Sequence, residues 1–248
     1  MIKFRQLGFG LAAALTFATG PVAAQGMSAE EREAFRAEVR AFLLDNPEVL
    51  MEAMDVLRER EALAEARADA QLLIENRAEI FEDGISWVGG NPDGDITVVE
   101  FLDYRCGYCR RAHEEMVQLL EADGNIRWVV KEFPILGPDS DAAARMAVAT
   151  LKTLGNDAYW RLHDTLMKFQ GPVNPQTMPV IAQRAEIDFA AIEGKLASAD
   201  TDEHILRVRA LGQALNISGT PAFVIGDTVL RGYLPLRDMQ AIVAQERS

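Results

Sequence analysis

The sequence predicts an α/β fold with a helical insertion, preceded by a separate helical segment. A β-branched run at residues 96–104, "ITVVEFLDY", leads directly into a helical pattern and then into a second strand pattern, "IRWVVKEFPI". Only helical patterns occur between about residues 139 and 216, and a short hairpin and a final helix follow them. Strands that alternate with helices in this order are typical of α/β proteins.

The N-terminal sequence "MIKFRQLGFGLAAALTFATGPVAAQG" has the features of a secretory signal peptide. Lys3 and Arg5 precede an apolar run, and Val22-Ala23-Ala24 offers a small-residue cleavage site. The run is short for a membrane span of ~20 apolar residues, although an uncleaved anchor is the alternative. We therefore expect residues 1–24 to be removed near Ala24, and the mature protein to be exported without insertion into the membrane.

Residues 25–82 are predicted to form a helical oligomerisation segment and linker. Ser28 and Glu31 have the spacing of a capping box, and Asn46-Pro47 interrupts the helix and restarts it. Residues 58–70 keep helix propensity but have little apolar surface, which predicts a solvated and flexible connector. An apolar stripe precedes this connector, formed by Phe35, Val39, Phe42, Val49, Leu50 and Met54. Two such helices cannot bury this stripe alone, so we expect self-association.

The composition restricts the partners of the protein. Its formal net charge is −13. A protein that binds a polyanion needs a basic face, so we expect neither nucleic acid nor anionic membrane surfaces as partners. We interpret the acidic excess as a contribution to solubility.

Residues 83–248 are predicted to form the main domain. A turn cluster at residues 89–95 precedes the central strand, and a helix begins at Cys106 and ends near Asp123. The second strand follows, then the helical insertion at about residues 139–216, the hairpin "PAFVIGD" and "TVLRGY", and a last helix from about Pro235.

The only two cysteines of the chain, Cys106 and Cys109, lie three positions apart. A strand that leads into a helix at Cys106 places this thiol at the helix N-terminus, where the N–H groups and the helix dipole stabilise a thiolate. Cys109 lies one turn further, so the pair can close a disulfide or exchange it with another protein. The alternatives are a structural disulfide, which would close too short a loop to stabilise much, a soft-metal site that His113 would join, and unrelated free thiols.

Three motifs resemble the DsbA-like branch of thioredoxin-fold proteins, and more closely the ScsC/Com1 group, named after suppressor of copper sensitivity. They are "VVEFLDYRCGYCRRAH", "VVKEFPILG" and "ISGTPAFVIGD". The resemblance covers essentially the whole mature chain, including the N-terminal helical piece that ends in "DNPEVL". It implies a thioredoxin fold with an inserted helical domain, preceded by the N-terminal helical oligomerisation segment.

The resemblance also implies the roles of single residues. Cys106 corresponds to the nucleophile and Cys109 to the resolving thiol. Glu100 corresponds to a buried acid that moves protons to and from the resolving cysteine. Strand alternation supports this position independently, because Glu100 shares a face with Val98 and Leu102, and burial there should raise its pKa; the alternative is an outward-facing charge.

Further residues are expected to contact the client protein. Thr220-Pro221 matches the family's cis-proline loop, whose backbone pairs with an extended substrate segment. Gly107 and Tyr108 lie between the cysteines, where related oxidases carry Pro-His. Because this dipeptide supplies no imidazole to stabilise the thiolate, we expect a less oxidising site. His113, His163 and Trp160 are treated as structural or surface residues, and no metal ligand is assigned.

Together these features predict a periplasmic disulfide isomerase or reductase that acts on cysteine-containing exported proteins. It needs no cofactor beyond its own cysteines, and the resemblance implies a membrane thiol reductase of the DsbD/ScsB type as partner. A homo-oligomer is expected, with a trimer favoured. The alternatives are a net dithiol oxidase of the DsbA type and a copper-binding or copper-tolerance protein.

Overall fold

The computed structural model describes residues 27–247, so the expected signal peptide and its cleavage site near Ala24 lie outside the described residues. The chain divides into two compact units, of which one ends at Arg58 and the other begins at Glu59. Each unit is described by itself.

The first unit contains helix α1 (Ala29–Asp45) and the start of helix α2 (Glu48–Glu75). The predicted capping box is formed: Glu31 donates its N–H to Ser28 Oγ over 3.2 Å and accepts the Ser28 N–H over 2.8 Å. The predicted interruption is also present, because the Asn46 side chain ends α1 by donating to the carbonyl of Phe42 over 2.9 Å. No residue of α1 is buried.

The second unit includes the last turns of α2 and the short helix α3 (Arg77–Phe81). Leu73 and Ile80 are buried in its core. Asp69 accepts two hydrogen bonds of 2.8 Å from the guanidinium of Arg231. The connector expected over residues 58–70 is exposed in its first part, but its end is fixed by this ion pair.

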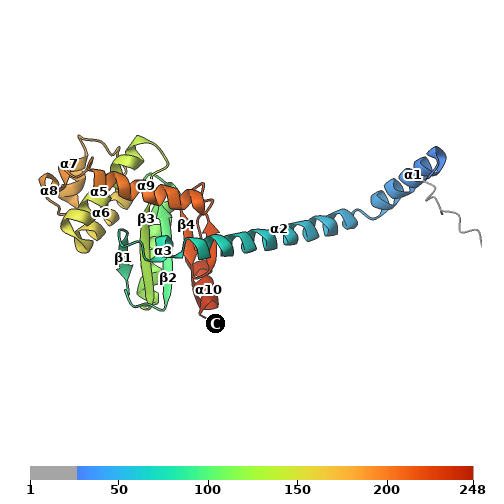
Figure 1. Cartoon of the computed structure of the whole chain (residues 1–248), viewed down its shortest axis with the longest axis horizontal. Helices are drawn as coiled ribbons and strands as arrows, with labels where there is room; N and C mark the ends of the chain where they lie inside the picture. The colour runs from blue at the N-terminus through green and yellow to red at the C-terminus, as the bar shows by residue number, and fades with distance from the viewer. Residues whose placement is uncertain (1–26, 248) are drawn as a thin grey trace, which may run out of the picture. The chain divides into compact units, whose positions relative to one another are not determined.

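A five-stranded sheet forms the centre of the second unit (Figure 1). Its strands are β1 (Trp87–Gly90), β2 (Ile96–Leu102), β3 (Ile126–Glu132), β4 (Ala222–Ile225) and β5 (Thr228–Arg231). Their order in the sheet is β1-β3-β2-β4-β5, with β2 parallel to β3 and every other pair antiparallel. The predicted central strand, second strand and hairpin are present.

Strand β1 lies partly where the sequence predicted a turn cluster, so that prediction was wrong for Gly89 and Gly90. Gly90 pairs with Arg127 of β3. A Cβ atom on Gly90, whose φ is +68°, would lie 2.4 Å from the carbonyl oxygen of Ile126, and one on Gly89 would overlap the ring of Trp87. Gly90 therefore permits a close approach of β1 to β3, which glycine in a strand often marks, and Gly89 leaves space for the Trp87 ring.

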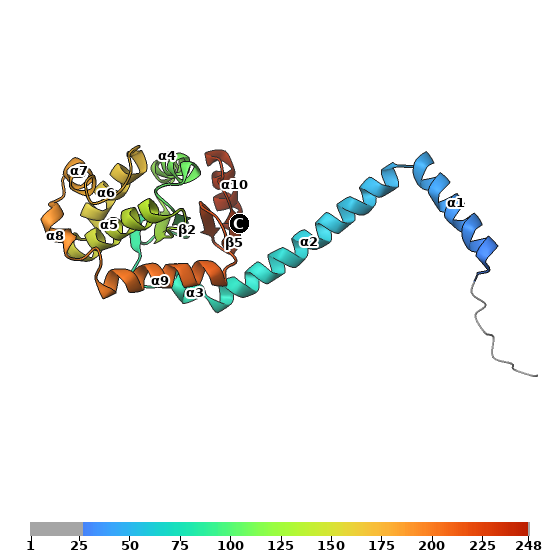
Figure 2. The same cartoon turned by 90° about the horizontal axis from the view of Figure 1, so that it is seen from above.

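Helices cover both faces of the sheet. One face packs against α4 (Gly107–Ala122), α10 (Leu236–Glu246) and the helical insertion, and it includes Val98 and Leu102. The other face, with Val99 and Phe101, packs against α3 and α9 (Ala199–Ala214). Figure 2 shows α4 and α10 on the opposite side of the sheet from α3 and α9. Burial on both faces explains why β2 is apolar at consecutive positions.

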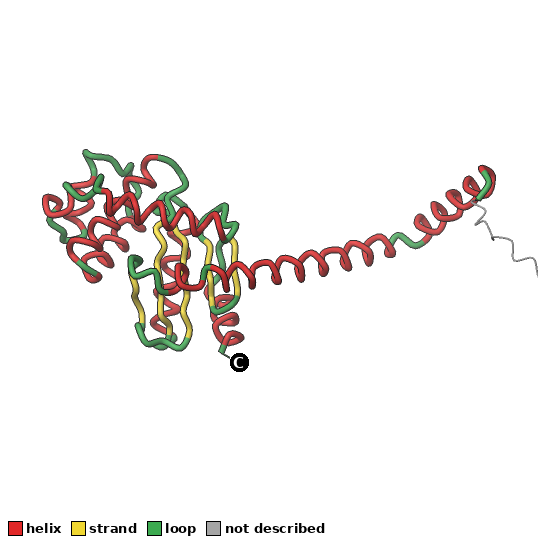
Figure 3. Tube along the Cα trace, in the orientation of Figure 1, coloured by secondary structure: helices red, strands yellow, loops and turns green. Residues whose placement is uncertain are grey.

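The helical insertion consists of α5 (Pro138–Leu154), α6 (Asn156–Lys168), α7 (Met178–Arg184) and α8 (Phe189–Glu193), which α9 follows. Figure 3 shows these helices gathered beyond one end of the strands. Trp87 joins the insertion to the sheet, because its indole N–H donates to the carbonyl of Asn156 over 3.2 Å and its ring stacks on Tyr159.

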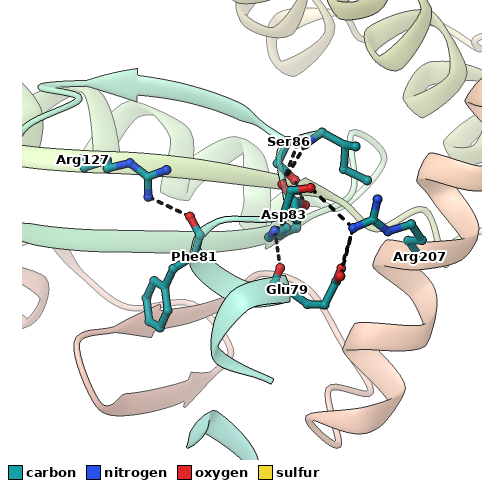
Figure 4. A network of polar contacts seen from close by, with 8 residues as sticks. Glu79, Phe81, Asp83, Ser86, Arg127 and Arg207 are labelled. Atoms are coloured by element: carbon teal, nitrogen blue, oxygen red, sulfur yellow. Dashed lines mark hydrogen bonds and ion pairs between the residues drawn. The ribbon is translucent and has the colours of Figure 1, made fainter. Parts of the chain in front are cut away.

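A buried lysine holds α3 against β3. The ammonium of Lys131 lies 2.6 Å from Asp83 Oδ2 and 2.7 Å from the carbonyl oxygen of Glu79. Figure 4 shows the surrounding contacts, in which Arg127 donates to the carbonyl of Phe81 and Arg207 pairs with Glu79. The network thus joins α3, the loop after it, β3 and α9.

None of the helices in residues 27–247 combines the length and apolar character needed to cross a membrane.

Candidate active site

The two cysteines lie where β2 ends and α4 begins, as the sequence predicts. Cys106 is the N-cap residue of α4, and its N–H donates to the carbonyl of Asp103 over 3.0 Å. Asp103 fixes this turn, because its carboxylate accepts the N–H of Arg105, the N–H groups of Ile135 and Leu136, and the hydroxyl of Ser140. The loop that follows β3 is thereby held beside the cysteines.

The Cys106 thiol is the more acidic of the two. Both cysteines are free. A hydrogen bond from Cys109 is the largest cause that lowers the pKa of Cys106 to about 5, outweighing partial burial. The Thr220 side chain and the N–H groups of Tyr108 and Cys109 in the first turn of α4 act in the same direction. Cys106 is therefore a thiolate near neutral pH, which is the nucleophilic form.

Cys109 is fully buried beneath Cys106. Burial raises its pKa far above the ordinary value, and the hydrogen bond to Cys106 and the charge of Glu100 raise it further. The N–H of Asp103 lies 3.5 Å from its sulfur. Cys109 therefore keeps its proton while Cys106 is charged, and must lose it before it can act as a nucleophile.

The Thr220-Pro221 loop lies opposite the cysteines. The peptide bond between Thr220 and Pro221 is cis. The Thr220 carbonyl oxygen is 3.1 Å from the sulfur of Cys106. Gly107 is exposed and Tyr108 is 62% exposed, so both lie at the mouth of the site. The fold brings together every residue that the sequence analysis selected.

Glu100 is fully buried on the face of β2 that points toward the cysteines, so the outward-facing alternative does not hold. Burial is the largest cause that raises its pKa to about 8, and the charges of Glu132 and Cys106 add to it, whereas the nearby Trp128 side chain opposes the rise. Neither carboxyl oxygen has a hydrogen-bond partner among the described residues. Such a group can accept or release a proton near neutral pH.

A second buried carboxyl, Glu132, was not selected from the sequence. Its Oε1 accepts hydrogen bonds from the hydroxyls of Tyr104 over 2.7 Å and Tyr159 over 2.6 Å. Burial raises its pKa to about 8, against the effect of both tyrosines. The alternation that places Glu100 inward also applies to β3, where Trp128, Val130 and Glu132 share a face, so the sequence did contain this signal.

The structural interpretation of His113 and His163 holds, but neither is a surface residue. Both are buried, and their rings lie 4.9 Å apart between α4 and α6. The ring of Trp160 stacks on His163 at 5.7 Å. Within residues 27–247, no group of three or more histidine, cysteine or acidic side chains is placed to hold a metal ion.

The site has the groups needed for thiol–disulfide exchange by a dithiol. These are a thiolate at a helix N-terminus, a protonated thiol beneath it and a carboxyl with a pKa near neutrality. Comparison with known proteins agrees with this class. The family model described as Thioredoxin matches residues 82–245, and the model described as Copper resistance protein ScsC N-terminal domain matches residues 31–64. The chain therefore belongs to the thioredoxin family, as a ScsC-like protein of the DsbA type.

Solved structures show the same relationship. A thioredoxin-like oxidoreductase from Silicibacter pomeroyi is 39% identical, with a TM-score of 0.66 over 69% of this chain and 98% of that one. Proteus mirabilis ScsC in a transitional conformation is 28% identical, with a TM-score of 0.66 over 89% of this chain and 98% of that one. The fold is thus a DsbA-like thioredoxin fold with an N-terminal helical segment.

Curated relatives match over about two thirds of the chain. Thiol:disulfide interchange protein DsbC of Escherichia coli is 28% identical over 157 residues, which are 63% of this chain and 54% of DsbC. Na(+)/H(+) antiporter NhaA 1 of Salinispora arenicola is 28% identical over 157 residues, which are 63% of this chain and 24% of the antiporter. The chain thus spans about half of the first relative and a quarter of the second.

Proposed function

We propose that the protein is a periplasmic disulfide isomerase or reductase that acts on exported proteins through Cys106. The acidity of the Cys106 thiol above a buried, protonated Cys109 is the observation that carries exchange through Cys106. The signal-like N-terminus supports export, and similarity to the thiol:disulfide interchange protein DsbC supports exchange between proteins.

The chemistry proceeds in two exchange steps. The Cys106 thiolate attacks a client disulfide, so a bond forms between Cys106 and one client sulfur, and the other client sulfur leaves as a thiolate. Either that client thiolate or another in the same client attacks the mixed disulfide and reshuffles the bond, or Cys109 loses its proton and attacks Cys106. In the second case the client is reduced and the Cys106–Cys109 disulfide forms.

Glu100 is the proposed acid–base group for Cys109. It is buried on the same side of the sheet, and its charge is one cause of the raised pKa of the Cys109 thiol. A neutral Glu100 can protonate Cys109 when the enzyme disulfide opens, and a charged Glu100 can accept the proton when the disulfide closes.

The client is proposed to bind as an extended segment beside Thr220-Pro221, where main-chain groups add a strand to the site. Tyr108 and Gly107 would contact its side chains. The ring of Tyr108 lies 6.0 Å from that of Tyr233, which is further held by Arg111 over its face and by Glu115 on its hydroxyl. The exposed ring of Tyr108 and the half-buried ring of Tyr233 offer apolar surface to a misfolded chain.

The N-terminal segment supports isomerisation in particular. Its stripe residues are exposed in α1 and α2 except for Val49, which is half-buried, and Phe35 and Phe42 are more than half exposed. We propose that copies of this stripe pack together in a homo-oligomer, a trimer by resemblance, so that several reduced sites reach one client. Proteus mirabilis ScsC, which matches over this segment as well, has structures in transitional and compact conformations, and this agrees with an adaptable linker.

The cysteine pair itself carries the electrons, so no cofactor is proposed. A reduced pair must be regenerated after each net reduction, and a membrane thiol reductase of the DsbD/ScsB type is the proposed partner. Cleavage near Ala24 would release the protein into the periplasm.

Two observations favour other functions. The pKa of Cys106 is about 5 even though Gly107 and Tyr108 supply no imidazole. A stable thiolate favours the reduced form of the cysteine pair, and this makes the Cys106–Cys109 disulfide a stronger oxidant. A net dithiol oxidase is therefore the second candidate. The match to a copper resistance protein domain over residues 31–64 favours a copper-binding or copper-tolerance role as the third.

Three assays distinguish these functions: insulin reduction, refolding of scrambled ribonuclease and refolding of reduced ribonuclease. An isomerase or reductase reduces insulin and reactivates scrambled ribonuclease when it is kept reduced. A net oxidase reactivates only reduced ribonuclease, and a copper carrier does none of these but binds Cu(I) stoichiometrically. Activity on reduced ribonuclease alone would refute our proposal.

A further inference from the structure

A continuous row of hydrogen-bonding side chains leads from the buried carboxyl of Glu132 to the protein surface. Glu132 Oε1 is 2.7 Å from the hydroxyl of Tyr104, and this hydroxyl is 3.0 Å from Nδ1 of His163. His163 Nε2 is 3.3 Å from Nδ1 of His113, and His113 Nε2 is 3.0 Å from Oδ1 of Asp164. The Asp164 side chain is 32% exposed and also pairs with Lys168.

The inner end of this row lies beside Glu100. In the parallel pair β2–β3, Glu100 is opposite Val130 and Leu102 is opposite Glu132, so the two carboxyls are diagonal neighbours on one face. The charge of Glu132 is one of the causes that raise the pKa of Glu100. Glu132 Oε2 and both oxygens of Glu100 have no hydrogen-bond partner among the described residues.

The donors and acceptors allow two proton arrangements in this row. If Glu132 is protonated, every hydrogen points outward: Glu132 donates to Tyr104, Tyr104 to His163, His163 to His113 and His113 to the Asp164 carboxylate, with both imidazoles neutral. If each hydrogen between Glu132 and His113 shifts by one step, Glu132 is a carboxylate and His113 an imidazolium paired with Asp164. The two arrangements differ by the transfer of one net positive charge along the row.

The surroundings decide where the proton rests. Burial raises the pKa of Glu132 to about 8 and lowers the pKa values of His113 and His163, so Glu132 holds the proton near neutral pH. Asp164 and Glu114 favour a charged His113, and Lys168 opposes it. Asp103 and Tyr159 are the other titratable groups that face Glu132, and Asp103 favours its protonated form.

We propose that the row Glu132–Tyr104–His163–His113–Asp164 conducts the proton that Cys109 loses or regains between Glu100 and solvent. This inference rests on the proposed acid–base role of Glu100. None of the five residues touches the reacting sulfur atoms of the client, so each acts as a proton-relay residue rather than as a catalytic one.

The step balances as follows. When Cys109 resolves a mixed disulfide, the Cys106–Cys109 bond forms, the bond from Cys106 to the client sulfur breaks, and the client leaves as a thiolate. The Cys109 proton passes to Glu100 and enters the row at Glu132, while a proton leaves at the His113–Asp164 end. When a reductase opens the Cys106–Cys109 disulfide, one proton moves inward by the reverse shift and ends on Cys109.

Two tyrosines provide a matched test, because both hydroxyls lie within hydrogen-bond distance of the same oxygen of Glu132, at 2.7 Å for Tyr104 and 2.6 Å for Tyr159. Tyr104 also contacts Nδ1 of His163, whereas the Tyr159 hydroxyl interacts with Tyr104 and Glu132 but has no hydrogen bond to a histidine nitrogen among the described residues. The mixed disulfide of Cys106 with glutathione is prepared in Tyr104→Phe, Tyr159→Phe and the wild-type protein. Glutathione release by Cys109 is followed by rapid mixing between pH 5.5 and 9, in light and heavy water, and thermal unfolding checks the fold.

The relay predicts that Tyr104→Phe slows glutathione release by about tenfold or more near neutral pH, within the range of positioned proton transfer, and changes its solvent isotope effect. Tyr159→Phe should stay within about twofold, and alkylation of Cys106 should be unchanged in both. Equal slowing in both variants would mean that the tyrosines only tune Glu132, and wild-type release rates in both would also overturn the relay.

A surface variant covers the case in which Tyr104→Phe fails to fold. Asp164→Asn keeps a hydrogen-bond acceptor for His113 but removes the charge that stabilises its imidazolium, so release should again slow about tenfold. Asp157→Asn on the same helix is the control and should release glutathione at the wild-type rate. Equal rates in the two variants would contradict the relay. A wild-type protein that releases no glutathione would instead refute the proposed function.

Discussion

At the scale of single residues, the site depends on opposite effects of burial on neighbouring groups. The helix N-terminus and hydrogen bonds keep Cys106 charged, whereas burial keeps Cys109 and the two carboxyls, Glu100 and Glu132, neutral. Groups whose pKa values are moved apart in this way are typical of acid–base chemistry.

The first prediction concerns the acidity of Cys106. The rate of alkylation by iodoacetamide in the reduced protein should follow a titration with a midpoint near pH 5, because the thiolate is the reactive form. Cys109 should remain unmodified over the same range. Mass spectrometry identifies the alkylated residue, and a midpoint near the ordinary thiol value of 9.0 would show that the helix N-terminus does not stabilise the thiolate.

The second prediction concerns Glu100→Gln, which replaces the carboxyl by an amide of similar size. Release of mixed disulfides near neutral pH should slow by about 100-fold, the lower range for a lost acid–base group. Rapid mixing with the glutathione mixed disulfide measures this. An unchanged rate and pH profile would remove Glu100 from the mechanism.

The same substitution also changes stability in a defined direction. The folded-state pKa of Glu100, about 8, exceeds its ordinary value of 4.5, so the folded state binds more protons than the unfolded state between these values. The cost of burying Glu100 therefore grows as pH rises from 4.5 to about 8. Glu100→Gln should unfold at a higher urea concentration than the wild type above pH 8.

At the scale of secondary-structure elements, ion pairs join helices to the sheet. Lys131 on β3 holds the loop after α3, and Arg231 on β5 holds the end of α2 through Asp69. The Lys131 side chain is fully buried in its pair, whereas the Arg231 side chain is 30% exposed.

Lys131→Met should lower the free energy of unfolding by about 3–5 kcal/mol, because it leaves Asp83 charged and nearly buried without its partner. Arg207→Gln breaks the exposed pair with Glu79 in the same network and should cost no more than ~1 kcal/mol. Urea unfolding of both variants provides the comparison. Equal losses would mean that the buried pair contributes nothing beyond a surface contact.

The sequence predicted the strands and helices around the cysteines because each has a clear period or a capping signal. Strand β1 was not predicted because glycine normally indicates a turn. Only the structure shows that Gly90 is needed for the close approach to the partner strand β3. Alternation places Lys131 and Glu132 on opposite faces of β3, so it predicts burial for only one of them. Both are buried because helices cover both faces of the sheet. The relay residues come from β3, the turn between β2 and α4, α4 and α6, which only the tertiary fold brings together.

At the scale of the whole molecule, the two units have separate tasks in the proposed mechanism. The second unit contains the complete dithiol site and its buried acids. The first unit presents the exposed stripe of α1 and α2, which is proposed to assemble copies of the chain. The ion pair between Asp69 and Arg231 indicates that a truncation should begin before residue 69.

A chain that begins at Glu59 should therefore be a folded monomer. It should reduce small disulfides at the wild-type rate but lose most of its activity on scrambled ribonuclease, because the sites no longer act at high effective concentration. Sedimentation of the full-length and truncated proteins, with both assays, measures this. A full-length protein that sediments as a monomer would contradict the proposed assembly.

The most direct test of the central claim, exchange through Cys106 with Cys109 resolving, is to trap the covalent intermediate. Cys109→Ala and Cys106→Ala are each incubated with scrambled ribonuclease, quenched by acid and analysed by mass spectrometry without reductant. We predict that Cys109→Ala accumulates a mixed disulfide at Cys106, because nothing resolves it, and that Cys106→Ala forms none. Trapping by Cys106→Ala, or by neither variant, would contradict the account.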